Sequence, residues 1–221
     1  MKKLFLFALF ISNIAFSQDL LQNLKTFKSI DISSAMDVEL VAADTAKIEV
    51  TGSDLEKLTI SDQGGELRIS TSLDKKFKSD LIVKIYYQPG LRYLKLANLV
   101  EISSNDTINE KFLEIDAINN VKVNLSLKTD DFIANLSLGS NFVLKGITES
   151  QKINASTKSF YDAFNFISKK AYVEAKTSQV GVNVTEFLDA NAKYKAEIVY
   201  TGNPYSVNEK TFLGKVISKK E

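Results

Sequence analysis

The residues available for chemistry are few in kind, because this 221-residue chain has no histidine, cysteine or tryptophan. The usual zinc, copper and iron ligands and the Ser–His and Cys–His catalytic pairs are therefore missing. The one adjacent acidic pair is Asp130-Asp131, which the pattern places in a polar loop. Clustered aspartates can bind calcium or serve as acid and base in glycan-cleaving enzymes. A solvated loop pair that caps backbone amides is the simpler interpretation, and it predicts no metal and no catalytic residue.

Aromatic residues gather between positions 160 and 172, namely Phe160, Tyr161, Phe164, Phe166 and Tyr172. Exposed aromatic rings can stack on sugars, whereas buried ones fill a core. The sequence does not decide whether the cluster Phe160 to Phe166 is core or surface. Asp130, Asp131, Tyr161 and Tyr172 are the candidate ligand-binding surface.

The elements that must position these residues repeat along the second half of the chain. An apolar position recurs every 19 or 20 residues, with a second inward position two residues later. The first series is Leu96, Ile115, Ala134, Ile153, Val173 and Ala192, and the second is Asn98, Ala117, Leu136, Ala155, Ala175 and Tyr194. Between them lies a polar column, which is the best candidate for a surface groove but is more simply an outward structural ladder: Asp116, Asn135, Asn154, Glu174 and Lys193. Each repeat therefore predicts a short strand with alternate residues inward.

A second strand follows each of these after a short bend rich in asparagine, a residue that tolerates left-handed backbone angles. A unit of about 19 residues cannot bury its apolar side chains alone, but stacked units form a continuous core. We therefore predict an all-β fold, a β-helix-like solenoid of about five or six two-stranded turns. A β-sandwich is the alternative, because regular short strands fit both.

The remaining organisation follows from composition along the chain. Met1-Lys2-Lys3, an apolar run and Ala15-Phe16-Ser17 predict a signal peptide over 1–17. We expect a linker over 18–26, an irregular N-terminal β region over 27–90 that caps the stack, the repeat stack over 91–204, and a C-terminal tail over 205–221. No segment of the mature chain is long and apolar enough to span a membrane as a helix.

The same stretches carry a family resemblance. Phe27 to Ile32, Asp37 to Leu40, Ile48 to Gly52, Gly64 to Ile69 and Val199 to Pro204 resemble the bacterial auto-transporter adhesin, head GIN domain family, a group of undefined function. The resemblance covers roughly residues 27 to 204 and implies a β-helical fold and an envelope or secreted location. The family's bends carry glycines where this chain has Asn98, Ile118, Leu138, Thr157 and Lys176. These bends are therefore expected to avoid the geometry that needs glycine.

The functional expectation is a secreted or periplasmic, non-catalytic, adhesin-like binding or envelope-structural module without a cofactor. The net charge of +1 gives no field to hold nucleic acid. The expected partner is a glycan or an envelope protein, and the sequence does not choose between them. The alternative function is a carbohydrate-active β-helix enzyme, a lyase or hydrolase, that uses clustered carboxylates.

Overall fold

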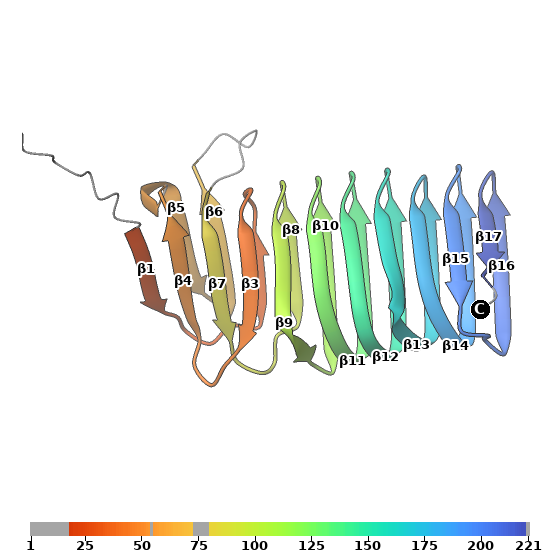
Figure 1. Ribbon diagram of the computed structural model, residues 1–221, viewed down its shortest axis with the longest axis horizontal. Helices are drawn as coiled ribbons and strands as arrows, with labels where there is room; N and C mark the ends of the chain where they lie inside the picture. The colour runs from red at the N-terminus through yellow and green to blue at the C-terminus, as the bar shows by residue number, and fades with distance from the viewer. Residues whose placement is uncertain (1–17, 54, 73–79, 220–221) are drawn as a thin grey trace, which may run out of the picture.

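A computed structural model describes residues 18–53, 55–72 and 80–219. Apart from the short 3-10 helix η1 (Leu55–Lys57), the regular elements of this part of the chain are β-strands. The predicted signal peptide, 1–17, lies outside the described residues. The fold is an elongated β-solenoid of about seven turns, which confirms the predicted class (Figure 1).

The repeat stack has two walls joined by tight bends. Its strands are β8 (Tyr93–Ala97), β9 (Glu101–Asn109), β10 (Phe112–Ile118), β11 (Lys122–Ser137), β12 (Asn141–Ser156), β13 (Phe160–Lys176), β14 (Gln179–Lys193), β15 (Glu197–Thr201), β16 (Ser206–Phe212) and β17 (Lys215–Ser218). Wall 1 contains β8, β10, the second halves of β11 to β14, and β16. Wall 2 contains β9, the first halves of β11 to β14, β15 and β17. Neighbouring strands in both walls are parallel, which excludes the antiparallel β-sandwich alternative.

The inward columns follow the predicted register in the middle of the stack. Ile115 pairs with Ala134, Ala134 with Ile153, and Ile153 with Val173, and all four side chains are buried. At the two ends the column continues to Leu94 and Ala190, not to Leu96 and Ala192 as the 19-residue step predicted. Leu96 and Ala192 instead extend the second column, in place of Asn98 and Tyr194. Because side chains alternate with period two, a slip of two residues keeps each residue on its face and is invisible in the pattern.

The N-terminal region builds its part of the solenoid in a different order. Its strands are β1 (Gln18–Asn23), β2 (Ser29–Ile32), β3 (Asp37–Ala42), β4 (Lys47–Gly52), β5 (Leu58–Gln63), β6 (Glu66–Thr71) and β7 (Ile82–Tyr87). β2 pairs with both β6 and β8, and β3 with both β7 and β9, so the first turn of the chain lies between two later ones. β5 pairs antiparallel with β6, and β4 with β7.

The segment expected to be a linker, 18–26, contains a strand. β1 pairs antiparallel with β4 along its whole length, from Gln18 opposite Gly52 to Asn23 opposite Lys47. Leu20 and Leu24 are partly buried against the core from this edge. The segment therefore belongs to the folded end of the solenoid, because its apolar side chains have a core layer to cover.

The predicted C-terminal tail, 205–221, also carries strands. β16 pairs in parallel with β14, and β17 with β15, so the stack continues past residue 204. Every residue of β16 is nevertheless exposed, because no strand of the described chain pairs with its outer edge. The sequence missed this turn because Glu209 and Thr211 stand at its inward positions, opposite Ala190 and Ala192.

The expectation that the bends avoid left-handed backbone geometry is wrong. Asn98, Leu138 and Thr157 have positive φ angles of 62°, 53° and 55°. At the other two bends the left-handed residues are Asn119, Asn120 and Thr177, not Ile118 or Lys176. The backbone amides of one bend bond to carbonyls of the next, as from Asn98 to Ile118 and from Leu99 to Asn119. Stacking of the bends therefore holds a conformation that costs Leu138 and the threonines about 1–2 kcal/mol each and the asparagines less.

Candidate functional site

The outer surface of wall 1 carries exposed aromatic rings near the C-terminal end of the solenoid. Tyr172 is 42% exposed, Tyr194 46% and Phe212 57%. Tyr172 occupies an outward strand position and contacts the Phe187 ring, with centroids 5.7 Å apart. Tyr194 lies in the bend after β14 and meets Phe212 edge to face at 5.5 Å. The rings therefore support one another in pairs and still present surface to solvent.

Two hollows adjoin these rings. One of about 210 Å³ is lined by Tyr172, Asn191 and Lys210 among others, and one of about 510 Å³ by Lys176, Tyr194 and Phe212. Both hollows include Asn154 and Glu174, so they adjoin on β12, β13 and β14. We call the two adjoining hollows together the wall 1 trough; its lining includes Lys152, Asn154, Tyr172, Glu174, Lys176, Asp189, Asn191, Lys193, Tyr194, Lys210 and Phe212. A shallow open depression suits a ligand that lies along the surface better than one that must be enclosed.

A ladder of polar side chains leads into the trough. The Tyr93 hydroxyl donates to Asp116, whose Oδ1 accepts from Asn135 Nδ2 at 2.6 Å. Asn154 Nδ2 in turn donates to Asn135 Oδ1 at 2.7 Å. Burial, followed by the hydrogen bond to Asp116, raises the pKa of Tyr93, so this hydroxyl stays protonated as a donor. The ladder fixes the amide of Asn154 at the edge of the trough.

The predicted polar column is continuous only in part. Asp116, Asn135, Asn154 and Glu174 stand in register, but the next member is Asn191. Lys193 belongs to the neighbouring column, opposite Lys176, although its Nζ reaches Glu174 Oε1 at 2.9 Å. The expected structural ladder therefore exists between Asp116 and Asn154, and beyond it the column lines the trough.

Of the four candidate residues from the sequence, Tyr172 lies in the trough and Tyr161 does not reach any surface. Tyr161 is completely buried, its ring 6.1 Å from that of Phe142, and its hydroxyl donates to Gln151 Oε1 at 2.8 Å. Burial holds its pKa well above the usual value. Tyr161 is therefore removed from the candidate surface, because it points inward in its strand.

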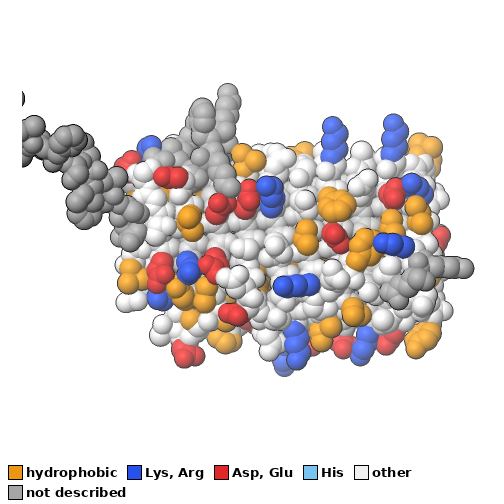
Figure 2. Space-filling model, viewed as in Figure 1, with side chains coloured by type: hydrophobic (Ala, Val, Ile, Leu, Met, Phe, Trp, Pro, Cys, Tyr) orange, Lys and Arg blue, Asp and Glu red, His pale blue; other side chains and the backbone are white. Residues whose placement is uncertain are grey.

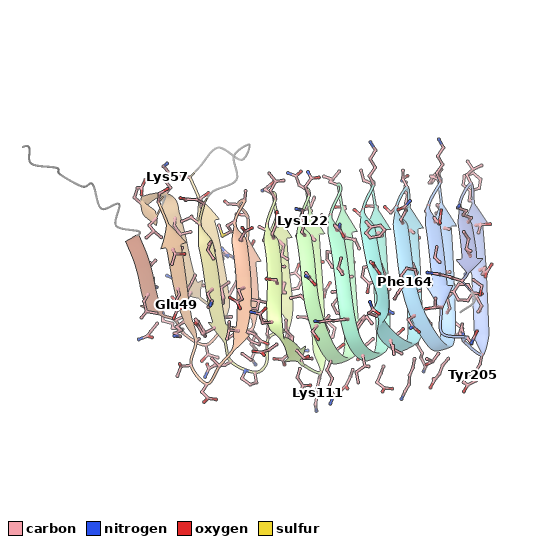
Figure 3. All side chains as sticks on the ribbon, viewed as in Figure 1. Glu49, Lys57, Lys111, Lys122, Phe164 and Tyr205 are labelled. Carbon is pink, nitrogen blue, oxygen red and sulfur yellow. The ribbon has the colours of Figure 1, made fainter. Side chains whose placement is uncertain are left out.

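The aromatic cluster around Tyr161 divides between core and surface. Phe166 is buried edge to face against Phe132, with centroids 5.5 Å apart, while Phe160 is 40% exposed on wall 2. Phe164 lies over Gly181, where an added Cβ would stand 2.6 Å from the ring. Phe164 is labelled in Figure 3. The Nζ of Lys219 lies 5.3 Å from the centroid of the Phe164 ring. The cluster is therefore not one binding stripe.

Asp130 and Asp131 are exposed at the corner between the two walls, away from the trough. Their backbone amides both donate to the Lys111 carbonyl, at 3.0 and 2.9 Å. Asp130 borders a hollow of about 510 Å³ that also includes Ile147 and Ile167. Among residues 18–53, 55–72 and 80–219, no three acidic side chains come together in a group that could hold a metal ion. The calcium cluster that the enzyme alternative needs is therefore not assembled around this pair.

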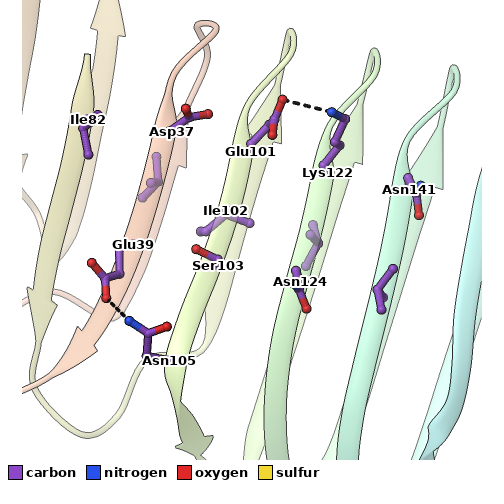
Figure 4. A pocket seen from close by; sticks show the side chains of 13 residues that line it. Asp37, Glu39, Ile82, Glu101, Ile102, Ser103, Asn105, Lys122, Asn124 and Asn141 are labelled. Atoms are coloured by element: carbon purple, nitrogen blue, oxygen red, sulfur yellow. Dashed lines mark hydrogen bonds and ion pairs between the residues drawn. The ribbon is translucent and has the colours of Figure 1, made fainter. Parts of the chain in front are cut away.

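A further hollow, of about 580 Å³, lies on wall 2 near the N-terminal region (Figure 4). Its charged groups bond to one another: Glu101 pairs with Lys122 at 3.0 Å, and Asn105 donates to Glu39 at 2.6 Å. Lys84 also pairs with Glu39, at 3.2 Å. Acidic and basic side chains accordingly alternate over this part of the surface in Figure 2. Glu39, Glu101 and Lys122 of this hollow are therefore paired, although Asn141, which also lines it, has a buried Oδ1 without a hydrogen-bond partner. We take the wall 1 trough as the candidate site because exposed aromatic rings border it.

Sequence reasoning missed Tyr194 and Phe212. Tyr194 was placed in an inward column because it stands 19 residues after Ala175, but it lies in a bend with a φ of 51°. Phe212 was assigned to a tail. A usable signal was the position of Tyr194-Lys195 in the repeat, which corresponds to that of the earlier bends. Tyr194 and Lys195 both adopt positive φ, as residues of those bends do.

Comparison with known proteins agrees with this architecture. The sequence profile of the family described as "Putative auto-transporter adhesin, head GIN domain" matches residues 26–204. The chain belongs to this family, and it is an adhesin-like module. No curated protein matches the sequence. The described residues include no helix long and apolar enough to cross a membrane.

Solved structures share the fold at low sequence identity. A putative adhesin from Bacteroides fragilis NCTC 9343 is 15% identical, with a TM-score of 0.80 over 92% of this chain and 96% of that one. A putative adhesin from Parabacteroides distasonis ATCC 8503 is 18% identical, with a TM-score of 0.72 and the same coverage. A protein described as a putative lipid binding protein, also from Parabacteroides distasonis ATCC 8503, is 16% identical, with a TM-score of 0.69 over 91% and 96%. At these identities the likeness shows the fold alone.

Proposed function

We propose that this protein is an exported, non-catalytic, adhesin-like module that binds glycan chains in the wall 1 trough. The observation that carries the proposal is the exposure of Tyr172, Tyr194 and Phe212 around a shallow hollow whose other lining is largely amide and charged side chains. Export rests on the N-terminal Met1-Lys2-Lys3, the apolar run that follows it, and Ala15-Phe16-Ser17.

The chemistry of the trough suits sugars. An aromatic ring offers an apolar face to the C–H groups of a pyranose. Because an aromatic side chain has few rotatable bonds, fixing it against a sugar costs little conformational entropy. Asn154, Asn191 and Glu174 supply amide and carboxylate groups at hydrogen-bonding positions beside the rings. Such groups fix hydroxyls of defined orientation, because buried donors and acceptors without partners are costly. An elongated molecule with an open trough on its side suits a polymer that continues past both ends of the site.

A binding screen on the chain from Gln18 onward tests the proposal. Immobilised polysaccharides and envelope glycans should retain the protein, and Tyr172→Ala and Phe212→Ala should each weaken the apparent Kd by about tenfold, or about 1.4 kcal/mol. Phe160→Ala is the matched control, since this ring is exposed to a similar degree on the opposite wall. Equal retention of all three variants, or loss with Phe160→Ala alone, would contradict the site.

The other two parts of the proposal have separate measurements. Expressed in a bacterial host, the full chain should be recovered outside the cytoplasm with Gln18 as its first residue, as N-terminal sequencing would detect. Retention of an intact Met1 would argue against export by a cleaved signal peptide. Incubation with each bound glycan should release no new reducing ends or unsaturated products. A release that Asp130→Ala and Asp131→Ala abolish would instead support the enzyme alternative.

A further inference from the structure

Positive charge concentrates around the wall 1 trough. Lysines on this side of β12, β13, β14 and β16 and in the adjoining bends are Lys152, Lys158, Lys170, Lys176, Lys193, Lys195 and Lys210. The acidic residues that line the trough are Glu174 and Asp189, and both have partners. Glu174 accepts from Lys193 at 2.9 Å, and Asp189 accepts from Asn208 Nδ2 at 3.2 Å. Glu186 of β14 and Glu209 of β16 are further acidic residues on these strands, outside the lining. The chain as a whole carries a net charge of only +1, so this is a local excess.

The N-terminal part of the same wall is arranged in the opposite way. There, Lys95 pairs with Asp31 at 3.2 Å and Arg68 with Glu66 at 2.6 Å. Glu114 and Asp116 add further acidic groups in the following turn. Bases on that part of the wall therefore have acidic neighbours, whereas the ion pairs among the described residues include none for Lys152, Lys176 or Lys210.

The lysines without acidic partners surround the aromatic rings. Lys152 precedes Tyr172 in the same outward column, directly opposite it on the neighbouring strand. Lys176 lies above the Tyr194 ring, with its Nζ 5.3 Å from the centroid. Lys210 lines the same hollow as Tyr172 and Asn191. A ligand that stacks on the rings must therefore lie within reach of ammonium groups on both sides.

From this arrangement we infer that the ligand of the trough is an anionic glycan, one that carries carboxylate, sulfate or phosphate groups along its chain. The inference rests on the proposed function, because it names the class of glycan for the same site. The rings bind the faces of the sugars, and the ammonium groups of Lys152, Lys176 and Lys210 bind the acidic substituents. Lysine is a compact point charge on a flexible stem, so it accommodates acidic groups at variable positions without the fixed fork of arginine. Four lysines line the trough, Lys152, Lys176, Lys193 and Lys210, whereas the two arginines of the chain, Arg68 and Arg92, lie elsewhere.

The test compares chemically matched ligands by isothermal titration calorimetry with the chain from Gln18 onward. Polygalacturonate and a sulfated glucan represent two acidic substituents, and carboxyl-reduced polygalacturonate and the unsulfated glucan are their neutral counterparts. At least one acidic polymer should bind about tenfold or more tightly than its counterpart, and the difference should shrink at about 1 M salt, where the screening length falls to about 3 Å. Equal affinity for both members of each pair would overturn the inference.

Variants separate this inference from the proposed function. The double substitution Lys152→Gln, Lys210→Gln should lower affinity for the acidic polymer about tenfold and leave any binding of the neutral one unchanged. Lys145→Gln, a change at an exposed lysine on wall 2, is the matched control. If Tyr172→Ala weakens binding but the lysine double variant does not, the glycan site stands and its anionic specificity falls.

The remaining outcomes also decide between sources of negative charge. If no glycan binds, the proposed function itself fails. If the protein binds single-stranded DNA or vesicles of anionic phospholipid as tightly as the acidic glycan, and Tyr172→Ala leaves that binding unchanged, the lysines act as a general anion surface and the inference is wrong. Loss of acidic-glycan binding with both the aromatic and the lysine variants, together with weak binding to DNA and vesicles, is the result expected.

Discussion

At the N-terminal end of the solenoid the outermost strands, β1 and β5, are antiparallel to their neighbours, whereas at the C-terminal end β16 and β17 continue the parallel stack. Leu20, Leu24, Leu55, Leu58 and Ile60 are partly buried against the core at the first end. The other end presents β16, which is exposed throughout and has Glu209 at an inward position. An inward charge on an edge strand discourages pairing with another chain. One end is thus covered by apolar side chains, and the other is protected by polarity.

The interior differs between the same two regions. One inward column runs from Ile69 through Ile32 and Leu96, and then continues as Ala117, Leu136, Ala155, Ala175 and Ala192. Large aliphatic residues fill it in the N-terminal region, and alanines predominate in the stack. Aromatic side chains such as Phe142 and Tyr161, fully buried from wall 2, occupy the core of the stack. The comparison indicates that the first region is held by aliphatic packing and the second by rings set against small residues.

The largest effect is expected from a cavity in the N-terminal core. Ile30 is completely buried and pairs in register with Leu67 and Leu94. Ile30→Ala should lower the free energy of unfolding by about 3 kcal/mol, since neighbouring strands cannot close the space. Val207→Ala, at the open end, should cost less than about 1 kcal/mol, because Val207 is 36% exposed. Urea titration followed by circular dichroism measures both, and similar values would erase the distinction between the ends.

The next effect concerns the narrow interior of the stack. Ala175 is fully buried between Ala155 and Ala192 in its column. Ala175→Leu should destabilise the fold by about 1–3 kcal/mol, because added methylenes have no free volume. Ile32→Leu conserves volume at the corresponding place in the N-terminal region and should cost less than about 1.5 kcal/mol. Thermal denaturation measures the stability of both variants. If Ala175→Leu costs no more than Ile32→Leu, the interiors of the two regions do not differ in free volume.

Alkaline stability should separate two buried tyrosines, one from each region. Burial raises the pKa of Tyr161 well above its usual value, and burial with the charges of Glu110 and Asp106 raises that of Tyr87 to about 12. Because these hydroxyls stay protonated in the fold, their contribution is complete below pH 10, where tyrosine in the unfolded chain ionises, and is lost as the pH rises further.

Tyr161→Phe should therefore reduce the decline in unfolding free energy above pH 10 while costing about 1–2 kcal/mol at pH 7, since Gln151 loses its donor. Tyr87→Phe should reduce the decline between pH 10 and about 12. Urea titrations at pH 7, 9, 10 and 11 measure the change. A pH dependence identical to that of the parent protein in both variants would contradict the assignment.

The smallest effect lies in the bends. Leu138 has a φ of 53°, which costs a non-glycine residue about 1–2 kcal/mol, so Leu138→Gly should stabilise the stack by about 0.5–1 kcal/mol. The N-terminal region already uses glycine at its β5–β6 hairpin, where Gly64 has a φ of 63° and no neighbouring atom within 4 Å of an added Cβ. Gly64→Ala should therefore destabilise by about 1 kcal/mol through backbone strain alone. Leu138→Gly should raise the denaturation midpoint and Gly64→Ala should lower it. Midpoint changes in the same direction for both variants would refute the explanation.

Much of the central stack was predictable from sequence, and the ends were not. Ile115, Ala134, Ile153 and Val173 align as the spacing predicted, because the turns between them differ in length by only one residue. At β8 and β14 the connections change length, and the register shifts by two without altering the apolar pattern. Tyr172 was found as an exposed candidate, whereas Tyr161 was misplaced because a single aromatic cluster contains both inward and outward positions.

The sequence by itself determined the strand periodicity, the inward residues of the central turns, the lack of metal-binding histidine and cysteine, and membership of an adhesin-like family. These follow from local alternation and from residue types, which need no knowledge of the partner strand. Only the tertiary structure decided that β2 and β3 lie between later turns, that β16 and β17 extend the stack, and that Tyr172, Tyr194 and Phe212 surround one trough. Those arrangements depend on which distant strands pair, and a period-two pattern fixes the face of a residue but not its neighbour.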